Sequence, residues 1–118
     1  MSWIHALTAI SWEYPGRPGA DCNTQSEADS DNFLLFLQEL RSTEPSLILS
    51  ADAGDVPFAG KGQVPLTDVS KFSEVLDFLT IMNYDIWGNS DAVAGPNSPL
   101  DDSCAPSDKQ HGSAMSAV

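Results

Sequence analysis

Two carboxylates stand at positions where acid–base chemistry is possible. Glu13 lies in the run Ser-Trp-Glu-Tyr-Pro-Gly at residues 11–16, directly after an apolar stretch, and Asp85 directly follows a second apolar stretch. In a parallel α/β arrangement both would lie at the edge of the sheet where the strands end and the connecting loops build active sites. The aromatic residues that flank them are Trp12, Tyr14, Tyr84 and Trp87.

Carboxylic acids beside aromatic rings are typical of glycoside chemistry. Flat aromatic faces stack on the apolar faces of sugar rings, and a carboxylic acid can protonate the leaving oxygen of a glycosidic bond. Any acidic α/β protein also carries carboxylates at strand ends. Helix capping and solvated loop positions are therefore the alternative interpretation.

The elements that must position these groups alternate along the chain. Patterning predicts a strand at 6–13, a helix at 31–42, a strand at 46–52, a brief helix capped by Asp68, a largely buried strand at 78–84 and the opening turns of a helix at 109–118. This order favours a parallel sheet with right-handed crossovers. Three strands cannot close a (β/α)8 barrel, which needs about 250 residues, whereas the chain has 118.

Charge excludes one class of partner. The 17 Asp and Glu residues against 5 Lys and Arg give a net charge of −12, which repels phosphate backbones, so we expect no nucleic-acid partner. Such a surface suits a neutral polymer such as a polysaccharide. No stretch is long and apolar enough to cross a membrane, so we expect no membrane partner. Residues 1–10 lack a basic region and a long apolar region, and we do not interpret them as a signal peptide.

The two cysteines, Cys22 and Cys104, allow one disulfide or two free thiols. Neither belongs to a Cys-x-x-Cys pair. His5 and His111 lie outside any cluster of thiols or carboxylates and are interpreted as incidental. We therefore expect no metal site.

Two motifs resemble those of one enzyme family. Trp-Glu-Tyr-Pro-Gly at 12–16 resembles the end of the Asp-Gly-x-Asp-x-Asp-x-Glu strand of glycoside hydrolase family 18 chitinases, and Met-Asn-Tyr-Asp at 82–85 resembles that family's Met-x-Tyr-Asp strand end. The segments 31–41, 84–88 and 95–106 are similar to the fungal secreted branch. The resemblance covers residues 11–118 as a partial catalytic domain and leaves 1–10 unmatched.

The resemblance implies a fold, a reaction and a cellular location. The fold would be an incomplete (β/α)8 TIM barrel, roughly strands four to six with their helices. The family cleaves β-1,4-linked N-acetylglucosamine polymers with retention, using the acetamido oxygen of the substrate as nucleophile. The implied partner is chitin or a chitooligosaccharide, no cofactor is needed, and the implied location is extracellular. Cys22 and Cys104 would both lie in loops on one face of the barrel, where a disulfide is plausible.

Roles carry over onto the matching positions. Glu13 would be the proton donor, Tyr84 would hydrogen-bond the attacking acetamido group, and Asp85 would contact the sugar at the cleavage site. The residues expected to bind substrate around them are Trp12, Tyr14, Met82 and Trp87.

The chain departs from the family's pattern on its first strand. The three Asp positions of the motif fall on Ser11, Ala9 and Ala6, and its Gly falls on Leu7. A serine hydroxyl carries no charge, and the loss of one preorganised group costs on the order of 10²–10³-fold in rate. Three hypotheses follow: a chitinase with impaired activity, a non-catalytic chitin-binding protein, or a truncated product without independent function.

Overall fold

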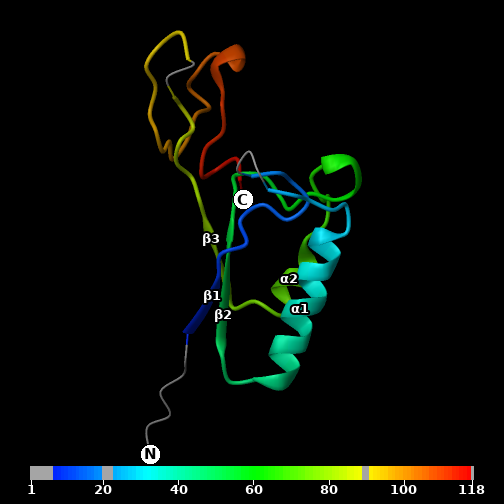
Figure 1. Ribbon diagram of the computed structural model, residues 1–118. Helices are drawn as coiled ribbons and strands as arrows, with labels where there is room; N and C mark the ends of the chain where they lie inside the picture. Colours follow the sequence, from blue (N-terminus) through cyan, green and yellow to red (C-terminus); the bar gives the residue numbers. More distant parts are fainter. Residues whose placement is uncertain (1–6, 20–22, 89–90, 118) are drawn as a thin grey trace, which may run out of the picture.

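Three parallel strands form one sheet in the order β1-β2-β3. The computed structural model describes residues 7–19, 23–88 and 91–117. The strands are β1 (Leu7–Ile10), β2 (Ile48–Ala53) and β3 (Phe78–Ile81), and the helices α1 (Asp29–Thr43) and α2 (Ser70–Ser73) connect them on one side of the sheet (Figure 1). Two 3-10 turns are η1 (Lys61–Gln63) and η2 (Ser107–Lys109). The predicted alternation as far as the third strand and the parallel sheet are confirmed.

The apolar stripe of α1 explains its length and its orientation. Phe33 and Leu37 are one turn apart and fully buried against the sheet. The helix starts at Asp29, whose carboxylate accepts hydrogen bonds from the backbone amides of Ser26 at 2.8 Å and of Gly16 at 3.3 Å. It ends before Pro45, as that residue requires. The observed helix is slightly longer at both ends than predicted.

A single core fills the space between the sheet and the helices. Its buried members are Phe33, Leu37, Leu49, Ala51, Ala53, Phe58, Phe72, Val75 and Leu76. The rings of Phe33, Phe58 and Phe72 contact one another with centroids 4.9 to 6.0 Å apart. Because Leu49, Ala51 and Ala53 alternate along β2, the residues between them face away from the helices. We call these two sides the helix face and the far face of the sheet.

Arg41 ties the last turn of α1 to the residues that precede β2 and β3. Its guanidinium donates to the carbonyl oxygens of Val75 at 2.8 and 3.0 Å and of Leu47 at 2.6 Å, and forms an ion pair with Asp77 at 2.7 Å. The Asp77 carboxylate also accepts a hydrogen bond from the Leu49 amide at 2.8 Å. This bond first, and then Arg41, lower the pKa of Asp77.

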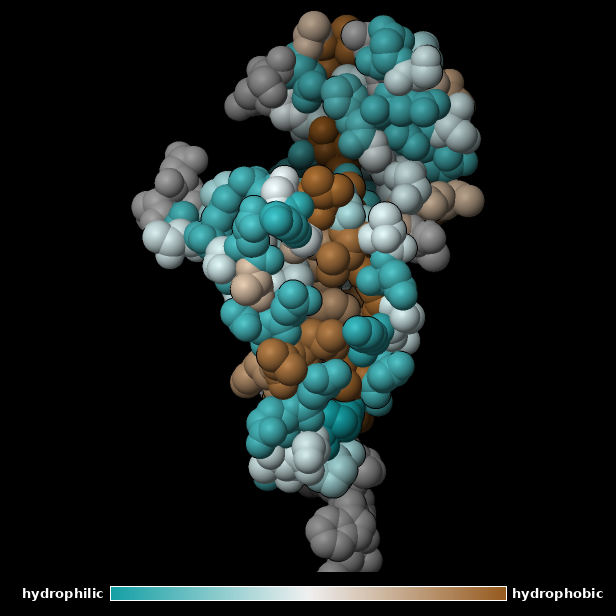
Figure 2. Space-filling model, turned by 90° about the vertical axis from the view of Figure 1, so that its right-hand side faces the viewer, coloured by the Kyte–Doolittle hydropathy of each residue, from teal (hydrophilic) through white to brown (hydrophobic). Residues whose placement is uncertain are grey.

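The helices cover the sheet incompletely. Figure 2 shows apolar side chains in a band down the helix side, between polar flanks. Phe36 and Leu35 on α1 are among the exposed large apolar residues. A mainly apolar cavity of ≈ 240 Å³ lies beside α2, where Phe72, Val69 and Leu79 are among its lining residues.

The strands are shorter than predicted, and β3 is not buried. The predicted strands at 6–13 and 78–84 end at Ile10 and Ile81. Phe78 and Leu79 are 48% and 42% exposed. Among the described residues, β3 pairs only with β2, so its other edge and much of its surface have no covering element. The brief helix at α2 is confirmed, and the Asp68 carboxylate accepts a hydrogen bond from the Ser70 amide at 2.9 Å.

The predicted helix at 109–118 is wrong. After η2, the described residues as far as 117 form only a turn. Gly112 has φ +117°, which a helix cannot contain. The hydroxyl of Ser116 donates to the Ser113 carbonyl and accepts a hydrogen bond from the Ser113 amide, so it competes with helical bonds. No described helix is long and apolar enough to cross a membrane.

Candidate functional site

The carboxyl ends of the three strands gather the candidate residues at one edge of the sheet. The pKa of Tyr14 reflects this arrangement, because the groups that shift it follow all three strands. Burial first, and then the nearby acidic groups of Glu13, Tyr84, Asp85 and Asp55, raise the pKa of the Tyr14 phenol. The two predicted motifs therefore both act on the Tyr14 phenol, as does Asp55 from the loop after β2.

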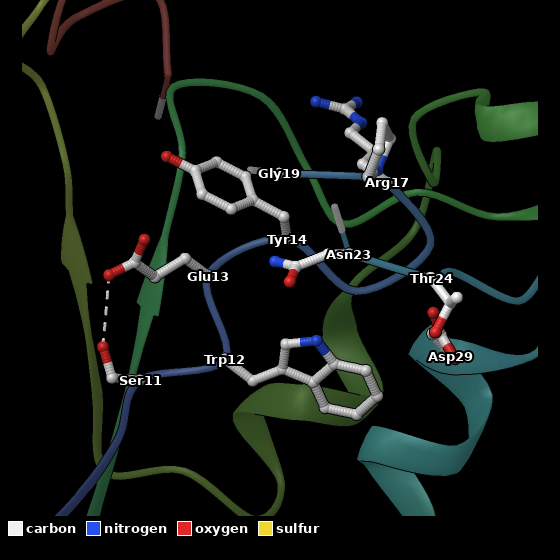
Figure 3. Close-up of a pocket in the computed structure, with 10 residues that line it drawn as sticks. Ser11, Trp12, Glu13, Tyr14, Arg17, Gly19, Asn23, Thr24 and Asp29 are labelled. Atoms are coloured by element: carbon white, nitrogen blue, oxygen red, sulfur yellow. Dashed lines mark hydrogen bonds between the residues drawn. The ribbon is translucent and has the colours of Figure 1, made fainter. Parts of the chain in front are cut away.

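Glu13 is half-buried and has a neutral neighbour. The Ser11 hydroxyl donates to Glu13 Oε1 at 3.2 Å. Figure 3 shows this bond and shows the Glu13 and Tyr14 side chains directed away from the Trp12 ring. The hydroxyl can stabilise the carboxylate by one hydrogen bond, but it supplies neither a charge nor a second acidic proton.

Glu13 and Tyr14 line two neighbouring hollows. The larger has a volume of ≈ 440 Å³, within the range of small-molecule sites. Its lining residues are Ser11, Trp12, Glu13, Tyr14, Arg17, Pro18, Gly19, Asn23, Thr24 and Asp29 (Figure 3). The smaller, of ≈ 60 Å³, extends past Asp55 to Phe58. Arg17 lines both and offers a cation beside an acidic edge.

The turn after Glu13 is locked to the loop that follows β2. Gly16 has φ +78°, and a Cβ there would lie 2.6 Å from the carbonyl oxygen of Ala59. The same oxygen accepts a hydrogen bond from the buried Ser30 hydroxyl at 2.6 Å. Only glycine fits this turn, so Pro15 and Gly16 of the motif hold the backbone that carries Glu13.

One edge of the Trp12 indole packs on the core, and the side chain also lines the larger hollow. Its ring packs edge-on against Phe33 with centroids 5.4 Å apart, and the side chain is 40% exposed. This places Trp12 on the helix face, opposite to Ser11 and Glu13. A sugar could reach only the edge that Phe33 leaves open, and the substrate-binding role of Trp12 stays a prediction.

The second motif is held by the long loop between β3 and η2, which we call the excursion. Asp85 has φ +57°, and its backbone amide donates to Asn97 Oδ1 at 3.1 Å. The Ile86 amide donates to the Asn97 carbonyl at 3.1 Å. Asn83 donates from Nδ2 to the Pro99 carbonyl at 2.8 Å and accepts a bond at its own carbonyl from the Ser98 hydroxyl. These bonds fix Asp85 in a left-handed conformation that aspartate tolerates better than most residues.

Asn97 and Asn83 were missed by the sequence interpretation. For Asn97 the signal was the Gly-Pro-Asn-Ser-Pro turn composition at 95–99, and Asn83 lay within the Met-Asn-Tyr-Asp motif without an assigned role. Tyr84 is 54% exposed at the edge, while Met82 is half-buried and donates its amide to the Ala53 carbonyl at 2.8 Å.

Trp87 anchors the excursion. The His111 ring lies 4.4 Å from the Trp87 ring, and a Cβ on Gly95 would overlap the indole. His111 thus has a packing contact with Trp87, and its interpretation as incidental to the chemistry stays a prediction. The subsite role of Trp87 stays a prediction.

The cysteine pairing also stays a prediction. Cys104 is an exposed free thiol, and Cys22 lies outside the described residues. Within the described part of the chain, no group of three or more His, Cys, Asp or Glu side chains is arranged to hold a metal ion.

Known proteins match both the sequence and this geometry. Residues 9–118 match the family described as glycosyl hydrolases family 18. A chitinase-like effector from Moniliophthora roreri is 47% identical over 109 residues, which are 92% of this chain and 27% of that protein. The chain thus spans about a quarter of the length of this relative.

Solved structures agree. A chitinase from Rhizomucor miehei superimposes with a TM-score of 0.76 at 34% identity, over 81% of this chain and 27% of its own. A group IV chitinase from Ostrinia furnacalis, crystallised with allosamidin, gives a TM-score of 0.68 at 29% identity, over 92% of this chain and 29% of its own. The three parallel strands with their helices are thus a partial α/β structure of a TIM-barrel family, and the chain belongs to glycosyl hydrolase family 18.

Proposed function

We propose that the chain is the Glu13-bearing part of a chitinase-like protein that binds chitooligosaccharides and hydrolyses them weakly or not at all. In this proposal β1, β2 and β3 correspond to strands four to six of the barrel, and residues 11–118 form the partial catalytic domain. One observation carries it: the hydrogen-bond partner of Glu13 is the neutral hydroxyl of Ser11, 3.2 Å away, where the family motif has a carboxylate.

The chemistry explains why this partner matters. Retaining, substrate-assisted cleavage needs Glu13 to protonate the leaving oxygen while the acetamido oxygen of the sugar attacks. Positive charge then develops beside the acetamido group, and a preorganised carboxylate at position 11 would oppose it. Ser11 supplies a dipole only, so we expect a loss on the order of 10²–10³-fold in rate. Tyr84 and Asp85 lie at the same edge and would still contact a bound acetamido sugar.

The name of one relative and the ligand of another are consistent with this proposal. The Moniliophthora roreri protein is named a chitinase-like effector rather than a chitinase. The Ostrinia furnacalis chitinase holds allosamidin in its crystal, which supports an oligosaccharide-type ligand for this edge. An effector name also supports an extracellular location for this chain.

Two assays test the proposal with the whole chain. Binding of chitohexaose is measured by calorimetry, and hydrolysis is measured with a fluorogenic chitobioside. We expect binding together with turnover at background. Ser11→Asp should raise turnover by up to about 10²-fold, whereas Ser42→Asp, which adds the same charge to exposed surface on α1, should not.

Each outcome decides between the hypotheses. Clear wild-type turnover that Glu13→Gln abolishes would show that the enzyme is active and that the missing carboxylate matters little. No binding and no turnover would favour the product without independent function. Binding with background turnover supports the proposal.

A further inference from the structure

The β1–β2 register, continued by one residue past the end of β1, sets Asp52 beside Ser11. In the β1–β2 ladder the last pair is Ile10 with Ala51, so the next step along both strands sets Ser11 against Asp52. In the β2–β3 ladder Asp52 pairs with Thr80. Adjacent strands lie about 4.8 Å apart, so Ser11, Asp52 and Thr80 form one row across the three strands.

All three members of this row face away from the helices. Ile10 packs against the buried core, so the next residue, Ser11, which directly follows β1, points to the opposite side. Ala51 and Ala53 are buried in the core, which sets Asp52 on the far face of β2. Leu79 and Ile81 line the cavity beside α2 on the helix face, so Thr80 points to the far face as well.

The Asp52 carboxylate is available on that face. It is half-buried, and no hydrogen bond or ion pair engages it among the described residues. The packing and hydrogen bonds that fix the fold therefore do not require its charge. The carboxylate sits one strand away from Ser11, whose hydroxyl is already committed to Glu13.

We propose that Asp52, on β2, supplies the carboxylate that position 11 lacks. The Asp52 carboxylate accepts a hydrogen bond from the acetamido N–H of the sugar bound over Glu13. The inference rests on the proposed function, because it assigns a specificity-determining residue to the same site. Hydrogen bonds to charged acceptors are roughly twice as strong as neutral ones. Asp52 would therefore set the preference for sugars that carry an acetamido group. It does not replace the family's Asp in catalysis, because it lies one strand away from position 11.

The test compares two ligands and three variants of the whole chain. Chitohexaose and cellohexaose share the β-1,4 backbone, but only the first carries acetamido groups. Asp52→Asn should weaken chitohexaose binding by at least about tenfold and leave cellohexaose binding unchanged. Asp31→Asn removes the same charge from the exposed first turn of α1 and should change neither. The double variant Ser11→Asp with Asp52→Asn moves the carboxylate back across one strand and should recover the preference.

The outcomes distinguish the role of Asp52 from the proposed function. If the wild type prefers chitohexaose and Asp52→Asn keeps that preference, the role of Asp52 is wrong and the proposed function stands. If the wild type binds neither ligand, both fall. An equal loss for both ligands, without recovery in the double variant, would indicate a structural role and overturn the inference.

Discussion

Replacing Arg41 with methionine should lower the free energy of unfolding by about 2–4 kcal/mol. The substitution leaves the Val75 and Leu47 carbonyl oxygens without their donors and removes the partner of Asp77. A part-buried acceptor left unpaired costs about 1–3 kcal/mol. We discount the ion pair, because the Asp77 side chain is 47% exposed and water screens it. The loss is large for a small domain, whose total stability is about 5–15 kcal/mol.

Urea unfolding followed by tryptophan fluorescence measures this loss. Lys71→Met on α2 is the matched control, since it removes a cation from an exposed position and should stay within about 0.5 kcal/mol. Arg41 lies at the amino ends of β2 and β3, opposite to the candidate site. Folded Arg41→Met protein should therefore bind chitohexaose as the wild type does. A destabilisation below about 1 kcal/mol would show that the carbonyl oxygens find other donors, and the argument from unpaired acceptors would then be wrong.

Three further predictions concern pH, the excursion and the motif. A hydrogen bond from a backbone amide of β2, and then the neighbouring arginine, lower the pKa of Asp77; its contribution to stability is present above the unfolded pKa of about 3.9 and is lost as the pH falls through the lower folded pKa. Unfolding curves of Asp77→Asn should therefore converge with those of the wild type in acid, and a constant difference would contradict this. Gly95→Ala should displace the Trp87 indole and cost about 1–3 kcal/mol, seen as altered near-ultraviolet dichroism; an unchanged spectrum would contradict it. Trp12→Ala should cost about 2–3 kcal/mol through lost contact with Phe33, while equal stability with lost binding would mark Trp12 as a sugar platform instead.

Elements with a strong apolar period could be predicted from the sequence, and the turn that replaces the expected terminal helix could not. The stripe on α1 repeats every turn and buries Phe33 and Leu37, so its position follows from the pattern alone. Residues 109–118 carry small and polar side chains without such a stripe. There the Gly112 conformation and the Ser113–Ser116 bonds decided the structure.

The candidate site divides in the same way. Glu13 and Asp85 could be placed because strand ends in a parallel sheet share one edge. The Asn97 ties, the packing of His111 on Trp87 and the row through Asp52 could not. Each of these relations joins residues far apart in the chain, and each depends on pairing register or loop path, which no local pattern encodes.

The motif at residues 11–16 is really two sets of side chains with separate requirements. Trp12 packs on Phe33, and Gly16 fits against the Ala59 carbonyl, so folding demands both whether or not Glu13 ever donates a proton. Ser11 and Glu13 face the other way and meet no such demand. The motif's resemblance to the family is therefore stronger evidence for the barrel fold than for hydrolysis. In the proposed function the decisive side chains lie on the far face, where Glu13 bonds the neutral Ser11 and Asp52 lies on the neighbouring strand, and substitutions on that face alone can test it.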